Sequence, residues 1–278
     1  MAYPIVPAPY GLKPVNLIGG QVFSGSTRNL PIQYGYATAI FYGDFVSLVR
    51  GTIVRSVVTT SASAAAVVGI FLGCYYTSPT TKQRLYSQYY PANVNAGDIT
   101  AIVADDPDTV FKAVVCSSGT TVASGSIPMI GQNYGMIDNA GNVNTGDSAA
   151  ALAYSATLTT STLPLRVVDV VRDTAYSYSA VGSSSTTTIT MTTGPNGNVL
   201  QGADVGYLAS NGQLIETGSF VTAAIAQGAT SGTLNVAPAV PGSITAIPSG
   251  STIVYTMYPE VLVKINFGIH EYYTATAV

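Results

Sequence analysis

Short runs of β-branched and aromatic residues, separated by glycine, proline or asparagine, recur throughout this sequence. Runs of this length and composition are typical of β-strands, and the residues between them are typical of turns. The stretch from Val67 to Val115 shows the pattern most clearly. The sequence therefore predicts an all-β protein with little helix, built as a β-sandwich or barrel-like body.

Four strands and one acidic turn are expected within that stretch. Gly69 and Gly73 interrupt the first apolar run and predict a β-bulge. The run Asp105-Asp106-Pro107-Asp108 is a candidate Ca²⁺ site, but its spacing matches no EF-hand loop and its composition is that of a tight turn, which we prefer. The expected strands are Val67–Thr77, Gln83–Tyr90, Ile99–Val103 and Val110–Val115.

The same stretch carries a motif made of Gly69, Phe71–Cys74, Tyr76, Thr77, Pro79–Gln83, Ser87–Pro91, Gly97–Ile99, Asp105–Asp108 and Phe111. This motif resembles a family of tailed-bacteriophage virion proteins, the capsid cement or decoration proteins. The resemblance extends to Pro9–Val15, Arg28–Ile32 and the closing residues Tyr258–Val278. It implies a structural protein on the outer surface of a capsid, with the major capsid protein as partner and a homotrimer as the common state.

An insertion is expected between two strands near the end of the sequence. Leu165–Val171 and Val261–Phe267 both read as strands, and the resemblance implies that they follow each other closely and pair. Short Thr, Val and Ile runs with almost no charge fill the residues between them. We expect an arm at 1–14, a discontinuous capsid-binding body at 15–175 with 258–278, and an outward-facing inserted β domain at 176–257.

Three local expectations concern less regular parts of the chain. The first strand after the arm is expected at Asn16–Ser24. The run Asn139–Asn142 predicts a hairpin turn, because asparagine and glycine tolerate the required dihedral angles. Ala149–Tyr154 is compatible with one or two helical turns.

The arm carries the residues expected to contact another subunit. Its four prolines hold the chain extended and prevent helix formation. Apolar side chains on a free arm would stay in water, so we expect them to lie on a neighbour, while a frayed terminus remains the alternative. The candidate contact residues are Tyr3, Pro4, Ile5, Val6, Pro7, Pro9 and Tyr10.

Composition restricts the partners of this chain. Charged residues make up only 8% of the sequence, against about 25% in an ordinary soluble domain. Such a surface is either polar and uncharged or hidden in an assembly, which favours a homo-oligomer. No apolar run reaches the ~20 residues of a membrane helix. The basic residues are scattered, so nucleic acid is not expected as a partner. No secretory signal is recognisable, and synthesis in the host cytoplasm is expected.

The sequence offers no catalytic constellation. His270 is the only histidine, and no nucleophile has a recognisable spacing to it, so a structural role is favoured. Cys74 and Cys116 lie in apolar strand contexts, and two buried reduced thiols are preferred over a disulfide. We expect neither an enzyme nor a bound cofactor or metal.

Three classes of function remain open at this point. The leading one is a non-enzymatic protein that decorates a phage capsid and cements its subunits. The alternative is a receptor- or glycan-binding virion module, in which the domain at 176–257 does the binding. A polysaccharide-degrading enzyme is least favoured, because no pair of carboxylates with catalytic spacing is recognisable.

Overall fold

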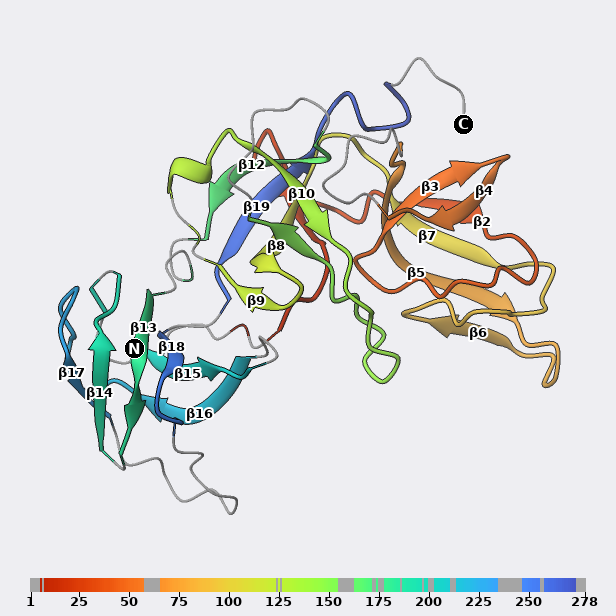
Figure 1. Cartoon of the computed structure of the whole chain (residues 1–278). Helices are drawn as coiled ribbons and strands as arrows, with labels where there is room; N and C mark the ends of the chain where they lie inside the picture. Colours follow the sequence, from red (N-terminus) through yellow and green to blue (C-terminus); the bar gives the residue numbers. More distant parts are fainter. Residues whose placement is uncertain are drawn as a thin grey trace. The chain divides into compact units, whose positions relative to one another are not determined.

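The computed structural model describes residues 6, 8–57, 66–123, 125, 127–154, 163–171, 174, 178–185, 187–196, 198–199, 203–210, 214–234, 247–255 and 258–273. Within these ranges the chain forms strands β1 to β19, one short 3₁₀ helix (η1, Ile127–Met129) and no α-helix (Figure 1). The expected all-β fold class is therefore confirmed. The described part of the chain has no helix of the length and apolar character that crossing a membrane requires.

The chain is organised in two compact units, each assembled from separate segments. Unit 1 comprises Met1–Ala8, Val115–Ile127 and Val170–Glu260, and unit 2 comprises Pro9–Val114, Pro128–Asp169 and Val261–Val278. The expected insertion at 176–257 falls within unit 1, and the motif residues from Gly69 to Phe111 fall within unit 2. Val115–Ile127 also belongs to unit 1, although these residues were expected in the body at 15–175 and nothing in the sequence pattern indicates the grouping.

Unit 1 contains a six-stranded sheet with a core on one face. In β14, Ile189 and Met191 are buried while the threonines that alternate with them, Thr188, Thr190 and Thr192, are not, which is the period of two expected for a strand with one buried face. The Tyr255 hydroxyl donates to Met191 Sδ at 3.0 Å inside this core. The strand order is β16 (Leu214–Phe220), β15 (Asp204–Leu208), β18 (Ser251–Tyr255), β13 (Tyr178–Ser184), β14 (Thr188–Thr193) and β17 (Ser231–Thr233).

One sheet of unit 2 contains three of the four strands expected between Val67 and Val115. The predicted bulge is confirmed, because the register of β5 against β7 shifts between Phe71 and Gly73. Gly69 is required by close packing, since a Cβ there would overlap the carbonyl oxygen of Ala104. The order is β2 (Arg28–Pro31), β7 (Thr100–Ala104), β5 (Gly69–Thr77), β3 (Phe45–Val49) and β4 (Thr52–Arg55), with β6 (Arg84–Ser87) paired to β5.

The other sheet, whose strands lie mainly in unit 2, closes on itself because β8 also pairs with β19. The fourth expected strand is confirmed as β8. The predicted pairing of Leu165–Val171 with Val261–Phe267 is confirmed, since β12 and β19 are neighbours. The order is β1 (Lys13–Leu17), β8 (Thr109–Ser118), β11 (Ala151–Ala153), β10 (Asn133–Ile137), β12 (Leu165–Val170) and β19 (Glu260–Ile265), with β9 (Thr121–Val122) on β8.

Three local predictions were wrong. The first strand begins at Lys13 rather than Asn16, and Pro14 pairs with Phe111; β1 is an edge strand, where a missing N–H is tolerated. The hairpin turn lies later than Asn139–Asn142, because the Gly146 N–H donates to the Asn142 carbonyl at 2.7 Å. Ala149–Tyr154 contains strand β11, which pairs with β10, instead of a helical turn.

Candidate functional site

The arm residues that the structure describes have partners within this chain. Val6 is 8% exposed, and its carbonyl accepts from the Tyr258 N–H at 3.3 Å. Pro9 is buried and Tyr10 is half-buried. The Lys13 ammonium lies 4.5 Å from the centre of the Tyr10 ring. Of the other candidate contact residues, Tyr3, Pro4, Ile5 and Pro7 lie outside the described residues.

An exposed Arg–Tyr cluster lies on the β5–β6 hairpin of unit 2. Tyr75 and Tyr86 face each other across the two strands, with ring centres 5.6 Å apart. The Arg84 guanidinium lies 4.1 Å from the centre of the Tyr75 ring and 5.5 Å from that of Tyr86. Tyr86 is 72% exposed and Leu85, which points the other way, is 40% exposed. Both faces of β6 therefore meet solvent.

Strand β6 also has an open edge. Among the described strands it pairs only with β5, so its second row of backbone groups faces away from the sheet (Figure 1). The loop before it is fixed by the Ser78 N–H donating to the Gln83 carbonyl at 2.8 Å and the Lys82 N–H donating to the Ser78 carbonyl at 2.9 Å. Lys82 adopts a φ of 60° in this loop. Backbone hydrogen bonds therefore fix the conformation of the loop that joins β5 to β6.

Large exposed apolar side chains are concentrated in unit 2. Of those that the structure describes, Ile127 alone belongs to unit 1. They include the ring of Tyr86 on the hairpin and that of Phe267 after β19. Single exposed apolar side chains are ordinary on protein surfaces, so only those that gather with other groups, such as Tyr86 beside Arg84, point to a binding surface.

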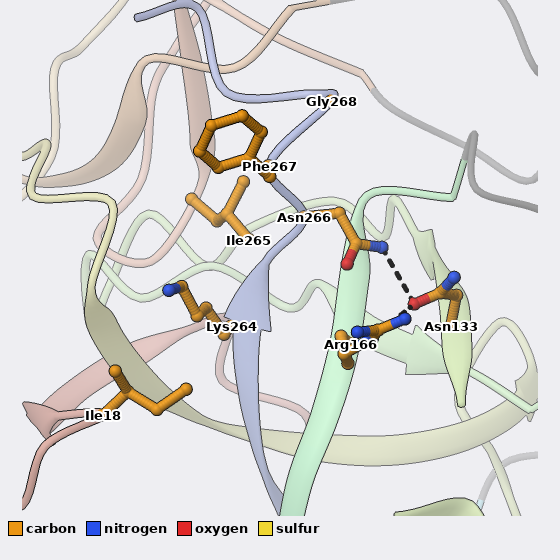
Figure 2. A pocket seen from close by; sticks show the side chains of 8 residues that line it. All are labelled: Ile18, Asn133, Arg166, Lys264, Ile265, Asn266, Phe267 and Gly268. Atoms are coloured by element: carbon orange, nitrogen blue, oxygen red, sulfur yellow. Dashed lines mark hydrogen bonds between the residues drawn. The ribbon is translucent and has the colours of Figure 1, made fainter. Parts of the chain in front are cut away.

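A pocket of about 350 Å³ lies beside the end of β19 in unit 2. Its polar part is centred on the Asn133 side chain, whose Oδ1 accepts from Arg166 Nε at 3.1 Å and from Asn266 Nδ2 at 3.1 Å. Figure 2 shows these two donors converging on one oxygen. In the same view Ile18 and Phe267 lie on the other side of β19. The complete lining is Ile18, Asn133, Arg166, Lys264, Ile265, Asn266, Phe267 and Gly268.

The acidic turn after β7 is a structural turn, as predicted. Asp106 Oδ1 accepts from the Asp108 N–H at 2.8 Å, and the Thr109 N–H closes the turn on the Asp106 carbonyl at 3.0 Å. Asp105 accepts from Arg28 Nε at 2.9 Å and from the Tyr272 hydroxyl. The Asp108 carboxylate pairs with Lys264. The three carboxylates thus have three different sets of partners.

His270 is buried in unit 2, with 1% of its surface exposed. Its Nδ1 accepts from the Tyr272 N–H at 3.3 Å. Burial lowers the pKa of His270, while the Asp105 and Asp106 carboxylates oppose that shift. Among the described residues, no three His, Cys, Asp or Glu side chains are grouped in a way that could hold a metal ion.

Both cysteines are buried and free, as expected. Burial raises the pKa of Cys74 and of Cys116 to about 12. A thiol with such a pKa is almost entirely protonated at neutral pH, so neither is a nucleophile in the folded protein.

Comparison with known proteins gives no relative: no family model, no curated protein and no solved structure matches the chain.

The Arg–Tyr cluster and the pocket were both missed in the sequence. The cluster had a local signal, the alternation of Arg84 and Tyr86 along one strand face. The pocket had none, because Asn133, Arg166 and Asn266 come from three separate strand regions.

Proposed function

We propose that this protein is a non-enzymatic structural component of a phage virion, which binds the outside of the capsid and cements neighbouring capsid subunits. The virion setting is supported by the sequence resemblance around Gly69 to Phe111. The observation that carries the binding role is the Arg–Tyr cluster on an exposed hairpin with an open strand edge.

The composition of this cluster supports binding to another protein. Tyrosine and arginine are, with tryptophan, the residues most enriched among those that dominate the energy of protein interfaces. Packing of Arg84 against the Tyr75 ring, with Tyr86 beside it, holds the guanidinium in place before binding, which reduces the side-chain entropy lost on association. The open edge of β6 adds backbone donors and acceptors that a partner strand can use. The occupant we propose is the major capsid protein.

The arm and the self-association follow from the same proposal. Val6 and Pro9 are packed within the chain, so the second contact that we propose rests on the rest of the proline-rich arm, and a homotrimer is the state that the resemblance implies. An interface of the usual size buries about 800 Å² on each partner. A low charge content suits a chain that spends part of its surface on such contacts.

The proposal is tested with capsids prepared with and without the protein and imaged by cryo-electron microscopy. The wild-type chain is expected to cover the shell, and the double variant Arg84→Ala, Tyr86→Ala is expected to bind at least about tenfold more weakly, since central interface residues of these types contribute about 2 kcal/mol or more. Tyr34→Ala is the matched control, because Tyr34 is also exposed on unit 2 but lies outside the hairpin. Density on the tail alone, or full decoration by the double variant, would contradict the proposal.

A further inference from the structure

We propose that the pocket beside β19 binds an acidic saccharide, with Arg166 receiving a carboxylate of the sugar and Phe267 receiving the apolar face of a sugar ring. This inference concerns unit 2 alone and stands independently of capsid binding. It also differs from the glycan-binding alternative considered for residues 176–257, because it places the site outside that segment.

The polar part of the pocket holds Arg166 in one orientation. Its Nε donates to Asn133 Oδ1 at 3.1 Å, and Asn133 is itself a buried residue that pairs with Arg166 in the register of β10 and β12. The two terminal nitrogens of Arg166 make no hydrogen bond to a described residue. A guanidinium held through Nε presents these nitrogens as a fork that matches a carboxylate.

The charge near the pocket favours an anion. Lys264 lines the pocket, but its ammonium is neutralised by Asp108 at 2.6 Å. Arg166 has no ion pair with a described residue, so its positive charge is available to a ligand. Asn266 is held by two hydrogen bonds from its Nδ2, to Asn133 and to the Leu163 carbonyl at 2.6 Å. The side chains of Asn133, Arg166 and Asn266 are therefore held in place before a ligand binds, and Arg166 is the cation among them without an ion pair to a described residue.

The aromatic part is prearranged as well. Phe267 is 68% exposed, yet its ring stacks on Tyr273 with a centre-to-centre distance of 3.9 Å and an interplanar angle of 19°. One face of the ring is thus occupied by Tyr273, and the other is left for a ligand. A ring fixed in this way loses little conformational entropy when it binds a flat apolar surface.

The spacing of the two parts favours a saccharide chain over a single small anion. Figure 2 shows the ring of Phe267 past the end of β19 and the Asn133–Arg166 group on the other side of that strand, so an occupant that contacts both must extend around the strand end. The pocket has a volume of about 350 Å³, within the range of ligand sites. Sugar rings combine hydroxyl and carboxylate groups with an apolar face, which matches a polar group beside an exposed ring. A pocket in unit 1, lined by Thr188, Ser231, Thr233, Gly232, Ile225 and two alanines, has neither a charged nor an aromatic side chain.

The experiment titrates the purified full chain with trigalacturonate, using calorimetry or ligand-observed NMR. The matched probe is the same trisaccharide with its carboxylates methyl-esterified. Saturable binding of the acid form is expected, with at least about tenfold weaker binding of the ester, because hydrogen bonds between charged groups account for a factor of this size. Arg166→Gln and Phe267→Ser are each expected to weaken binding by about tenfold, while Tyr34→Ser leaves it unchanged.

Several outcomes would overturn the inference. The first is the absence of saturable binding up to about 10 mM, a range in which weak ligands are still detected. The second is equal binding of the acid and esterified trisaccharides. The third is wild-type affinity in both the Arg166→Gln and the Phe267→Ser variants. Equal or tighter binding of a tri-aspartate peptide would show that the pocket takes an acidic peptide instead. Phe267 is exposed, so Phe267→Ser keeps the test decisive if Arg166→Gln disturbs the hydrogen bond to Asn133.

Discussion

Arg55 Nε donates to Asp44 Oδ2 at 3.0 Å, and the Asp44 side chain is only 3% exposed. The same guanidinium also reaches the Asp138 carboxylate through its terminal nitrogen. One half-buried cation therefore serves two carboxylates, which come from parts of unit 2 that are distant in the sequence. Burial raises the pKa of Asp138, and Arg55 opposes that rise.

Replacing Arg55 by methionine is expected to lower the free energy of unfolding by about 3 to 5 kcal/mol, because a buried carboxylate is left without its partner. Urea denaturation followed by circular dichroism measures this loss. The control is Lys13→Met, since the Lys13–Asp147 pair is 4.0 Å apart and partly exposed, and such pairs contribute less than about 1 kcal/mol. Similar losses in the two variants would show that burial of the Arg55 pair is unimportant.

Gly69→Ala is expected to destabilise unit 2 by about 1 to 3 kcal/mol, the usual penalty for forcing extra volume into a packed core. The new methyl group would overlap the backbone of Ala104, and a backbone atom cannot rotate away. Gly97→Ala is the matched control, because a Cβ at Gly97 meets nothing within 4 Å. Thermal unfolding of both variants distinguishes them, and an unchanged melting temperature for Gly69→Ala would refute the packing argument.

Stability is expected to fall as the pH is lowered below about 6.5, the ordinary pKa of histidine. The pKa of His270 in the folded chain is lowered by burial. The unfolded chain therefore binds a proton first, and the contribution of His270 is complete above its unfolded pKa and lost as the pH falls towards its folded pKa. Asp105 and Asp106 oppose the shift and Lys264 strengthens it.

The unfolding free energy measured in urea between about pH 8 and pH 5 tests this dependence on His270. His270→Gln is expected to flatten the curve, since the sequence has no other histidine. Glu271 acts in the opposite sense at lower pH, because burial raises its pKa and its protonation favours the folded state. A variant curve with the wild-type slope would exclude His270 as the cause.

Cys74 and Cys116 are expected to react with Ellman's reagent only after unfolding. Their burial and a pKa of about 12 leave almost no accessible thiolate in the native state. Absorbance at the thionitrobenzoate band, recorded with and without denaturant, measures the reaction. Rapid labelling of either thiol in native buffer would mean that its strand opens readily.

The fold class could be predicted from the sequence because runs of β-branched residues favour strands, and turn residues favour turns, through interactions with their near neighbours in the chain. The strands from β5 to β8 are marked by such runs, and the bulge at Gly73 is marked by its glycine. Strand β13 was missed, since its sequence YSAVGSS has little β-preference of its own. Its pairing with β18, about 70 residues later, overrides that local signal.

The candidate sites depended even more on long-range pairing. Asn133 and Arg166 meet because β10 and β12 place them directly opposite each other. Asn266 reaches the same group because β19, which it follows, lies beside β12. No spacing in the sequence reports such a register. The Arg–Tyr cluster, by contrast, lies on one hairpin and was within reach of local pattern analysis.

The segment after β19 is bound to parts of unit 2 that are synthesised much earlier. Glu271 accepts from the Leu48 N–H at 2.9 Å across 223 positions of the sequence, and its own N–H donates to the Val67 carbonyl at 2.9 Å. During translation the segments around Leu48 and Val67 therefore lack these partners until Glu271, 223 positions after Leu48, has been synthesised. Contacts of such sequence separation slow folding and prolong the exposure of unfinished strands. The newly made chain therefore exposes these segments to aggregation until Glu271 has been added.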